Sequence, residues 1–180
     1  MTAPQLTPYK DALSDAMSYL GQQEDTIFVG QQIVYAGNPM STTLQGVDKT
    51  KMIELPVMEE SQMGITIGLA MSGSTVISFY PRWDFIILAC NQLINHIDKY
   101  KLMTGKDLSI MIRLGKGSDK PLDPGHQHKG NYLQEFRSMC PNIEFHDLKS
   151  TDIIVQNYRR AYNQKGIHVL VEYPELYYVQ

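Results

Sequence analysis

The stretch that decides the fold is Leu55–Gly73, LPVMEESQMGITIGLAMSG. A proline stops a short apolar run, and the acidic pair Glu59 and Glu60 precedes a helix predicted over residues 61–72. Negative charge is favourable at a helix amino terminus. Two glycines four residues apart keep the side chains on part of this helix small. The stretch therefore predicts a helix with an acidic start that a flat neighbouring group can approach closely.

Apolar runs of strand length alternate with helical patterns on both sides of this stretch. Strands are predicted at 26–29, 52–55, 75–79, 108–113, 143–146 and 167–171, and helices at 8–20, 61–72, 84–103, 132–139 and 151–164. Such alternation is typical of an α/β fold with a doubly wound, mostly parallel sheet and helices on both faces, in three layers. We expect one domain over residues 1–180, with ligands at the carboxyl ends of the strands.

The composition excludes several classes of protein. The chain has 180 residues, is 43% hydrophobic and carries a formal net charge of -3, with no basic stripe that indicates a nucleic-acid partner. No apolar run is long enough to span a bilayer and no leader pattern opens the chain, so a cytoplasmic protein without a membrane partner is expected. Cys90 and Cys140 have no metal-binding or redox spacing and are interpreted as buried thiols.

The first motif is centred on Glu59, which lies three residues after Pro56, five before Gly64 and nine before Gly68. A second block contains Phe85, in the triplet WDF, and is followed by the helical pattern QxxN. A third block is the loop sequence GHQHKG at residues 125–130. In order and spacing, these three blocks resemble the pyrimidine-binding domain of thiamine-diphosphate enzymes, in particular the transketolase and 2-oxo-acid dehydrogenase beta-subunit family.

The resemblance assigns roles to individual residues. Glu59 corresponds to the glutamate that hydrogen-bonds the cofactor pyrimidine and activates it, and Phe85 to the aromatic residue that packs on that ring. Met58 and Pro81 are the further expected cofactor contacts. His128 aligns better than its neighbour with the active-site histidine that moves substrate protons. The other two site residues, His126 and Arg82, are assigned to substrate binding.

Each assignment has a structural alternative. An acidic pair is common at any helix start, a lone aromatic residue is often core, and two histidines in a polar loop can simply be solvated. A metal site at His126 and His128 lacks an evident third ligand, so no metal ligand is assigned. Arg82 and Arg113 could bind a substrate carboxylate or phosphate, or could be surface or interface charges.

Two departures from the family pattern bear on function. The GDG segment and downstream asparagine that hold magnesium and the diphosphate are missing, and so is the carboxyl-terminal domain. The resemblance therefore implies a beta-like subunit of a split enzyme acting on a 2-oxo acid or ketose. An alpha-like partner would hold Mg²⁺ and the diphosphate. Self-association through the 84–103 helix is also expected, and residues 173–180 could form an arm onto another subunit.

Two other functions stay open. The chain could be a non-catalytic assembly or regulatory subunit that keeps the pyrimidine-domain fold. It could also be an unrelated doubly wound domain that acts on a small molecule, because one fold hosts many functions.

Overall fold

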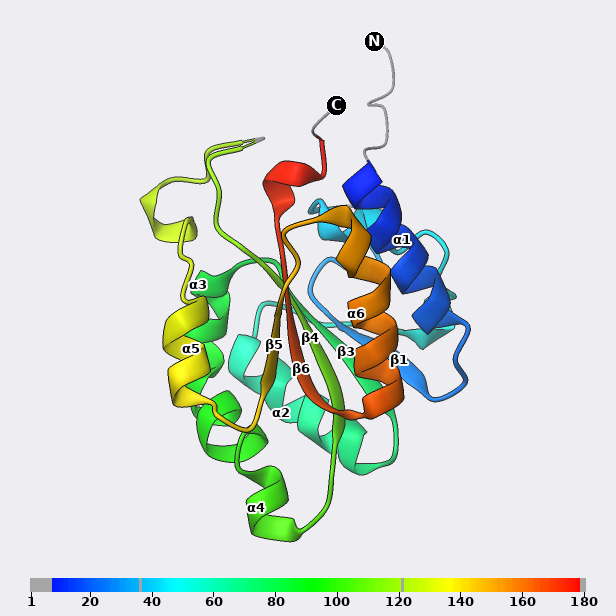
Figure 1. Ribbon diagram of the computed structural model, residues 1–180, viewed down its shortest axis with the longest axis vertical. Coiled ribbons are helices and arrows are strands. Elements are labelled where there is room, and N and C mark those ends of the chain that lie inside the picture. The colour runs from blue at the N-terminus through cyan, green and yellow to red at the C-terminus, as the bar shows by residue number, and fades with distance from the viewer. Residues whose placement is uncertain (1–7, 36, 121, 179–180) are drawn as a thin grey trace.

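The computed structural model describes residues 8–35, 37–120 and 122–178 (Figure 1). Its centre is a six-stranded sheet in the order β2-β1-β3-β4-β6-β5, and all five strand pairings are parallel. The strands are β1 (Thr26–Gly30), β2 (Met52–Glu54), β3 (Thr75–Tyr80), β4 (Ser109–Gly115), β5 (Glu144–Asp147) and β6 (Gly166–Glu172). This arrangement confirms the expected α/β, doubly wound fold class.

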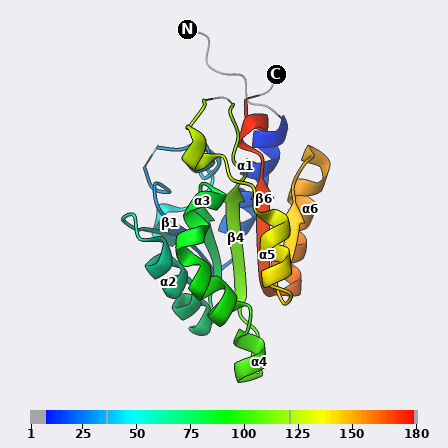
Figure 2. The same cartoon turned by 90° about the vertical axis from the view of Figure 1, so that its left-hand side faces the viewer.

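Helices cover both faces of the sheet (Figures 1 and 2). On one face, α1 (Pro8–Gly21) packs beside α6 (Thr151–Gln164). The other face carries α2 (Glu59–Met71), α3 (Trp83–Ile86) and α5 (Leu133–Met139), with α4 (Tyr100–Thr104) at one end of the sheet. In the described part of the chain, no helix is both long and apolar enough to cross a bilayer.

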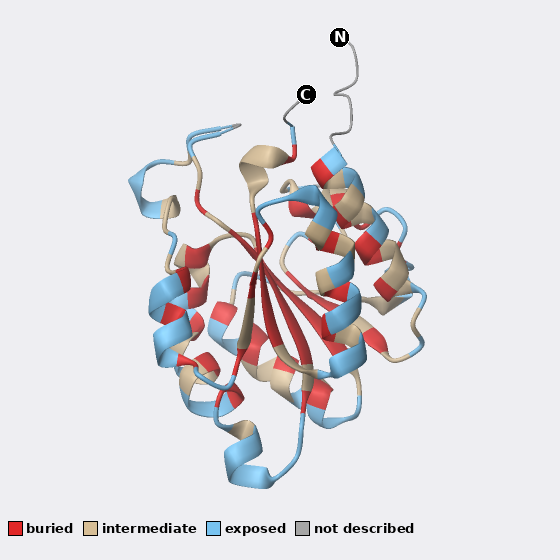
Figure 3. Ribbon diagram, in the orientation of Figure 1, coloured by how far each residue is buried: buried red, intermediate tan, exposed pale blue. Residues whose placement is uncertain are grey.

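Burial follows the pattern that a three-layer fold requires. Every residue of β3 is buried, as expected for a central strand that is covered on both faces. In α6 the buried side chains are Ile154, Tyr158 and Ala161, spaced by three or four residues along one helix face. Figure 3 shows the resulting buried sheet between partly exposed helices. Two apolar clusters result, one on each face of the sheet.

The prediction of one continuous helix over residues 84–103 is wrong, because the segment changes helix type along its length. After α3, a 3₁₀ turn at 87–89 leads into a π-helical segment, Gln92–Ile97, and a turn precedes α4. The Asp98 amide donates to the Leu93 carbonyl, a π-type bond of 2.9 Å. The buried Asp98 carboxylate then accepts two hydrogen bonds from Asn142, at 2.8 and 3.1 Å. This anchor explains the irregular turn.

Two smaller expectations also need correction. The helix after the acidic pair begins at Glu59 itself, so both carboxylates lie in the first turn of α2. The end of the chain does not extend away as an arm, because 174–176 form a turn and Tyr177 is fully buried beside Tyr9. The arm prediction therefore fails for residues 173–178, and its last two residues lie outside the described chain.

Candidate functional site

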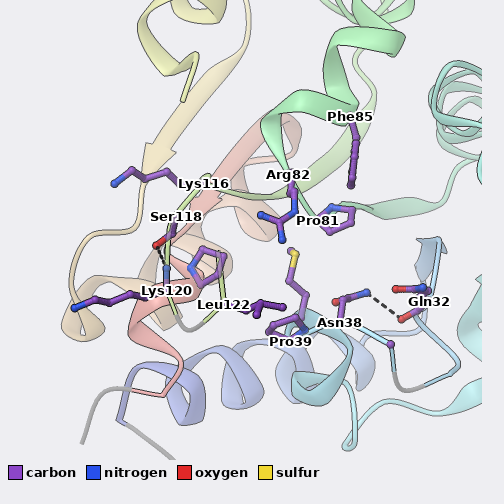
Figure 4. Close-up of a pocket in the computed structure, with 13 residues that line it drawn as sticks. Gln32, Asn38, Pro39, Pro81, Arg82, Phe85, Lys116, Ser118, Lys120 and Leu122 are labelled. Atoms are coloured by element: carbon purple, nitrogen blue, oxygen red, sulfur yellow. Dashed lines mark hydrogen bonds between the residues drawn. The ribbon is translucent and has the colours of Figure 1, made fainter. Parts of the chain in front are cut away.

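A pocket of about 320 Å³ opens beyond the carboxyl ends of the central strands (Figure 4). The chain passes from β1 to the edge strand β2 and returns to β3 on the other side of β1, so the strand order reverses between β1 and β3. Ligands bind at such switch points in open α/β sheets. The lining residues are Gln32, Gly37, Asn38, Pro39, Met40, Pro81, Arg82, Phe85, Lys116, Ser118, Lys120, Leu122 and Pro174.

Three residues expected at the site line this pocket: Pro81, Arg82 and Phe85. They lie in and just after the turn from β3 into α3, which brings them together at the pocket wall. In Figure 4 the Arg82 side chain projects into the pocket, with Asn38 and Pro39 across from it. The structure thus brings together residues from four separate segments, which follow β1, β3, β4 and β6.

The loop after β4 is closed at its base and carries the expected histidines. The Gly117 amide donates to the Gly130 carbonyl at 3.1 Å, and the Gly130 amide donates to Asp84 at 3.2 Å. Gly117 must lack a side chain, because a Cβ there would lie 2.2 Å from the backbone of Lys129. The end of the loop is therefore fixed against the start of α3.

This closure positions His128 and leaves His126 outside. The His128 ring lies edge-on to Phe85, with centroids 5.5 Å apart, and its carbonyl accepts a 3.0 Å hydrogen bond from Arg82. Neither histidine lines the pocket, and His126 is exposed. The geometry therefore places His128, rather than His126, beside the expected site residues.

The acidic pair is split by burial. Glu59 is 6% exposed, whereas Glu60 points outward and is exposed. The Tyr80 hydroxyl, at the end of β3, donates to the Glu59 carbonyl at 3.3 Å, and burial together with the nearby Glu59 charge raises the pKa of Tyr80. Met58 precedes the helix and is half-buried. Glu59 and Met58 do not line the pocket; they lie at the start of α2, which the Tyr80 bond joins to the end of β3, one residue before the pocket-lining Pro81.

One turn beyond Glu59, Gln62 is a buried polar residue that the motif analysis missed. Its side-chain amide donates to the Ser78 hydroxyl at 3.2 Å and to the Phe79 carbonyl at 2.8 Å, which joins α2 to β3. Its side-chain oxygen is buried without a hydrogen-bond partner among the described residues. These bonds fix the start of α2, and so Glu59, against the sheet.

The pocket lining is cationic. Arg82, Lys116 and Lys120 line it, and no described lining residue is a carboxylate. Burial lowers the pKa of Arg82, and nearby Asp84 opposes that shift. Lys116 lies over the Tyr173 ring and 3.4 Å from Glu175, at the pocket rim. This charge pattern suits an anionic ligand.

Glu54 shapes the opposite wall and was not singled out from sequence. Its carboxylate accepts backbone hydrogen bonds from Gln32, Ile33 and Val34 at 2.5, 2.9 and 2.9 Å. The bonds hold the loop after β1 in a sharp bend, in which Gln32 has a φ of 55°. A carboxylate at the end of a short strand gives no sequence signal of such a role.

Arg113 is neither a ligand-binding residue nor a surface charge, which corrects both interpretations of it. It is fully buried and forms a bidentate ion pair with Glu172. It also donates to Thr43 at 3.0 Å and lies over the Phe79 ring at 4.8 Å. Burial lowers the pKa of Arg113, but Glu172 outweighs this effect and raises it. The pair ties the segment that follows the β1 loop to the sheet.

Comparisons with known proteins agree with this geometry. No family model matches the chain. The pyruvate dehydrogenase E1 component subunit beta of Gracilaria tenuistipitata var. liui is 26% identical over 140 residues, which cover 74% of this chain and 42% of that relative. The chain thus spans less than half the length of this curated relative.

Two solved structures share the fold. A split-gene transketolase, described as an inactive beta4 tetramer, superposes with a TM-score of 0.73 at 15% identity over 95% of this chain and 52% of its own. Transketolase from Campylobacter jejuni gives 0.76 at 16% identity over 100% of this chain and 28% of its own. The chain resembles the beta-type pyrimidine-binding domain of thiamine-diphosphate enzymes. Its sequence relatives and its fold agree on this point.

The residues present suit one half of a thiamine-diphosphate site. A pyrimidine-binding domain needs a buried carboxyl group and an aromatic surface, and Glu59 and the half-buried Phe85 offer them near the end of β3. The pocket lining offers no carboxylate among its described residues, and hard cations such as Mg²⁺ prefer oxygen ligands. The site therefore suits the organic ring of the cofactor better than a metal-bound diphosphate.

Proposed function

We propose that this chain is the beta-like, pyrimidine-binding subunit of a split thiamine-diphosphate enzyme that acts on a 2-oxo acid or a ketose. The observation that carries the proposal is the burial of Glu59, and not Glu60, at the start of α2, where the Glu59 carbonyl accepts a hydrogen bond from Tyr80, the residue before the pocket-lining Pro81. The pyruvate dehydrogenase beta subunit and the transketolases named above support the class of enzyme.

The proposed roles come from the resemblance to the family, and the placement of the residues supports them. Thiamine diphosphate, when bound, supplies the carbanion chemistry. Glu59, which is buried at the start of α2, hydrogen-bonds the pyrimidine. Phe85 packs on the ring, with Met58 and Pro81 beside it. His128, held against Phe85, moves substrate protons.

The substrate itself would meet the cationic side of the pocket. Arg82 projects into the pocket and offers a planar donor set to a carboxylate or phosphate. His126 is exposed in the isolated chain and would reach substrate only in the assembled enzyme. Both residues are expected to affect substrate affinity more than cofactor binding.

An alpha-like subunit would complete the site by holding Mg²⁺ and the diphosphate. The carboxylate-free pocket lining supports this division of labour. Self-association would use the 84–103 segment, where four large apolar side chains are exposed: Ile87, Leu88, Leu102 and Met103. Exposed apolar groups concentrated in one segment are typical of protein interfaces. We place the assembly in the cytoplasm.

The test is to isolate the chain with its natural partner and compare Glu59→Gln with Glu60→Gln. Glu59→Gln keeps the size of the side chain but removes its acid, so turnover of 2-oxo acids or ketoses with thiamine diphosphate and Mg²⁺ should fall about 100-fold or more. Glu60→Gln changes an exposed neighbour and should retain activity. Light scattering should show the same assembly for both variants.

Full activity of the Glu59→Gln complex would overturn the catalytic assignment. If thiamine diphosphate stabilises no complex that contains this chain, a non-catalytic assembly subunit with the same fold becomes the better explanation.

A further inference from the structure

A second cluster of chemically capable side chains lies on the opposite face of the sheet from α2, beneath α6. Glu144 and His146 project from the edge strand β5, and His168 from its neighbour β6, where Glu144 and His168 are paired in register. Both imidazoles are buried, whereas the Glu144 side chain is 40% exposed. The ligand atoms of these three residues all lie within 4.8 Å of one another.

Hydrogen bonds fix which nitrogen of each histidine carries its proton. The Asn157 side-chain amide donates to the Ile153 carbonyl at 2.8 Å, so its oxygen faces His146 Nδ1 at 2.9 Å and must accept there. His168 Nε2 lies 2.8 Å from the Lys165 carbonyl, which can only accept. Neutral His146 therefore carries its proton on Nδ1, and neutral His168 on Nε2.

The consequence is that two bare nitrogens face each other. His146 Nε2 and His168 Nδ1 are 3.0 Å apart, and in the neutral rings both present lone pairs. Two facing lone pairs in a buried site repel each other unless a cation lies between them.

A carboxylate completes this arrangement. Glu144 Oε1 is 3.8 Å from His146 Nε2, and Oε2 is 3.6 Å from His168 Nδ1. Arg160, on α6, forms an ion pair with Glu144 Oε1 at 2.8 Å. The Arg160 side chain is half-exposed, so solvent screens its charge. Because Glu144 is itself partly exposed, its side chain can shift toward the histidines without repacking the core.

We propose that Glu144, His146 and His168 bind a divalent transition-metal ion of the zinc class, with a fourth position open to water. Two imidazoles and one carboxylate are a common zinc donor set, and bonds of about 2.0–2.1 Å place tetrahedral ligand atoms about 3.3 Å apart. The two ring nitrogens are 3.0 Å apart, and the two Glu144 oxygens lie 3.8 and 3.6 Å from one ring each. With one ligand atom from each residue, the three atoms lie within 4.8 Å of one another, so a shift of the partly exposed Glu144 side chain would complete the set. Each ring donates its other N–H to an oxygen, as metal-bound histidines do.

The ion would lie apart from the candidate site. The cluster joins the edge strand β5 to β6 beneath α6, whereas the pocket lies beyond the carboxyl ends of the central strands (Figure 1). An ion here would fix the four-residue edge strand to its neighbour. This inference is independent of the proposed function, since no cluster residue lines that pocket.

The experiment uses the whole chain, stripped with EDTA and kept in a non-chelating reductant so that the cysteines stay reduced. Zn²⁺ is added in competition with a chromophoric chelator, and melting is followed in parallel. We expect one equivalent of zinc to bind and Tm to rise by about 5 °C or more at a hundredfold excess over Kd. Co²⁺ in place of Zn²⁺ should give the absorption of a four-coordinate site.

Four variants test whether the zinc binds at this cluster. His168→Gln should abolish the stoichiometric binding, and Glu144→Gln should weaken it at least tenfold without disturbing a fully buried group. His96→Gln changes an exposed histidine and is the matched control that should bind zinc normally. His128→Gln tests the loop histidines and should also bind normally.

Zinc binding that survives both His168→Gln and Glu144→Gln would overturn the proposal, as would the absence of stoichiometric binding to the unaltered chain. Imidazole nitrogen NMR that shows a proton shared between the two rings in the presence of excess zinc would likewise replace the metal with a histidine–histidinium pair.

Discussion

Glu172 and His168 lie four residues apart on the same face of β6, and each belongs to a buried polar cluster beneath α6. The Glu172 carboxylate has partners for both of its oxygens, because Arg113 binds it with two nitrogens and the Tyr158 and Tyr177 hydroxyls also donate to it. At His168, Nδ1 lies 3.0 Å from His146 Nε2, and in the neutral rings neither nitrogen carries a proton to donate to the other. The cluster in which every charged group has a partner stabilises the fold, whereas the two facing nitrogens of the histidine cluster suit a bound cation.

The complete cluster should respond most strongly to mutation. Arg113→Met leaves the Glu172 charge buried without its partner, so we expect the free energy of unfolding to fall by about 3–5 kcal/mol. Equilibrium unfolding in urea measures the loss. The double variant Arg113→Met/Glu172→Met removes both charges and should recover part of it. If Arg113→Met alone unfolds like the parent chain, the ion pair is not the anchor described here.

The incomplete cluster should respond according to whether metal is present. His168→Leu in EDTA loses a hydrogen bond to the Lys165 carbonyl but also removes the facing lone pairs, so a cost of about 1 kcal/mol or less is expected. With zinc at a hundred times Kd, the free energy of unfolding of the parent chain rises by about 2.7 kcal/mol, whereas that of His168→Leu does not change. The stability difference between the two chains therefore increases by the same amount.

Urea unfolding of both chains, with and without zinc, gives the four values required. If His168→Leu lowers the free energy of unfolding equally in EDTA and in zinc, zinc does not stabilise the chain through His168, and the two clusters do not differ in the way described. A cost in EDTA as large as that of Arg113→Met would have the same effect.

The sequence predicted much of this architecture, because its signals are local. The helix predicted over residues 151–164 matches α6 residue for residue, since its apolar spacing and polar flanks lie within one window. The motif around Glu59 also selected the buried member of an acidic pair. The catalytic and binding roles of Glu59, Phe85 and His128 remain predictions.

What the sequence did not reveal depends on contacts between distant segments. Glu144 and His168 meet only because β5 and β6 pair in that register, and Arg113 meets Glu172 across 59 positions. Neither pairing has a short spacing that a motif could express. The break in the 84–103 segment likewise depends on Asp98 reaching Asn142, a contact that helical periodicity does not contain.

A third, more exposed cluster sets the lower end of the comparison. Asp25 accepts hydrogen bonds from Thr75, Tyr162 and Lys165, the residue whose carbonyl also binds His168. Partial burial raises the pKa of Asp25, but these hydrogen bonds outweigh it and lower the pKa to about 2. Because its side chain is 36% exposed, solvent screens most of this gain.

Asp25→Asn should therefore cost only about 0.5–1 kcal/mol at pH 7. The folded pKa lies below the unfolded value of about 3.9, so the contribution is present above pH 4 and is lost as pH falls toward 2. Urea unfolding at a series of pH values should show the two chains converging over that range. Thr75→Val removes one of the hydrogen bonds and should shift the convergence toward pH 4. If the stability of the two chains changes with pH in parallel down to pH 2, the ionised Asp25 carboxylate adds nothing to the free energy of unfolding.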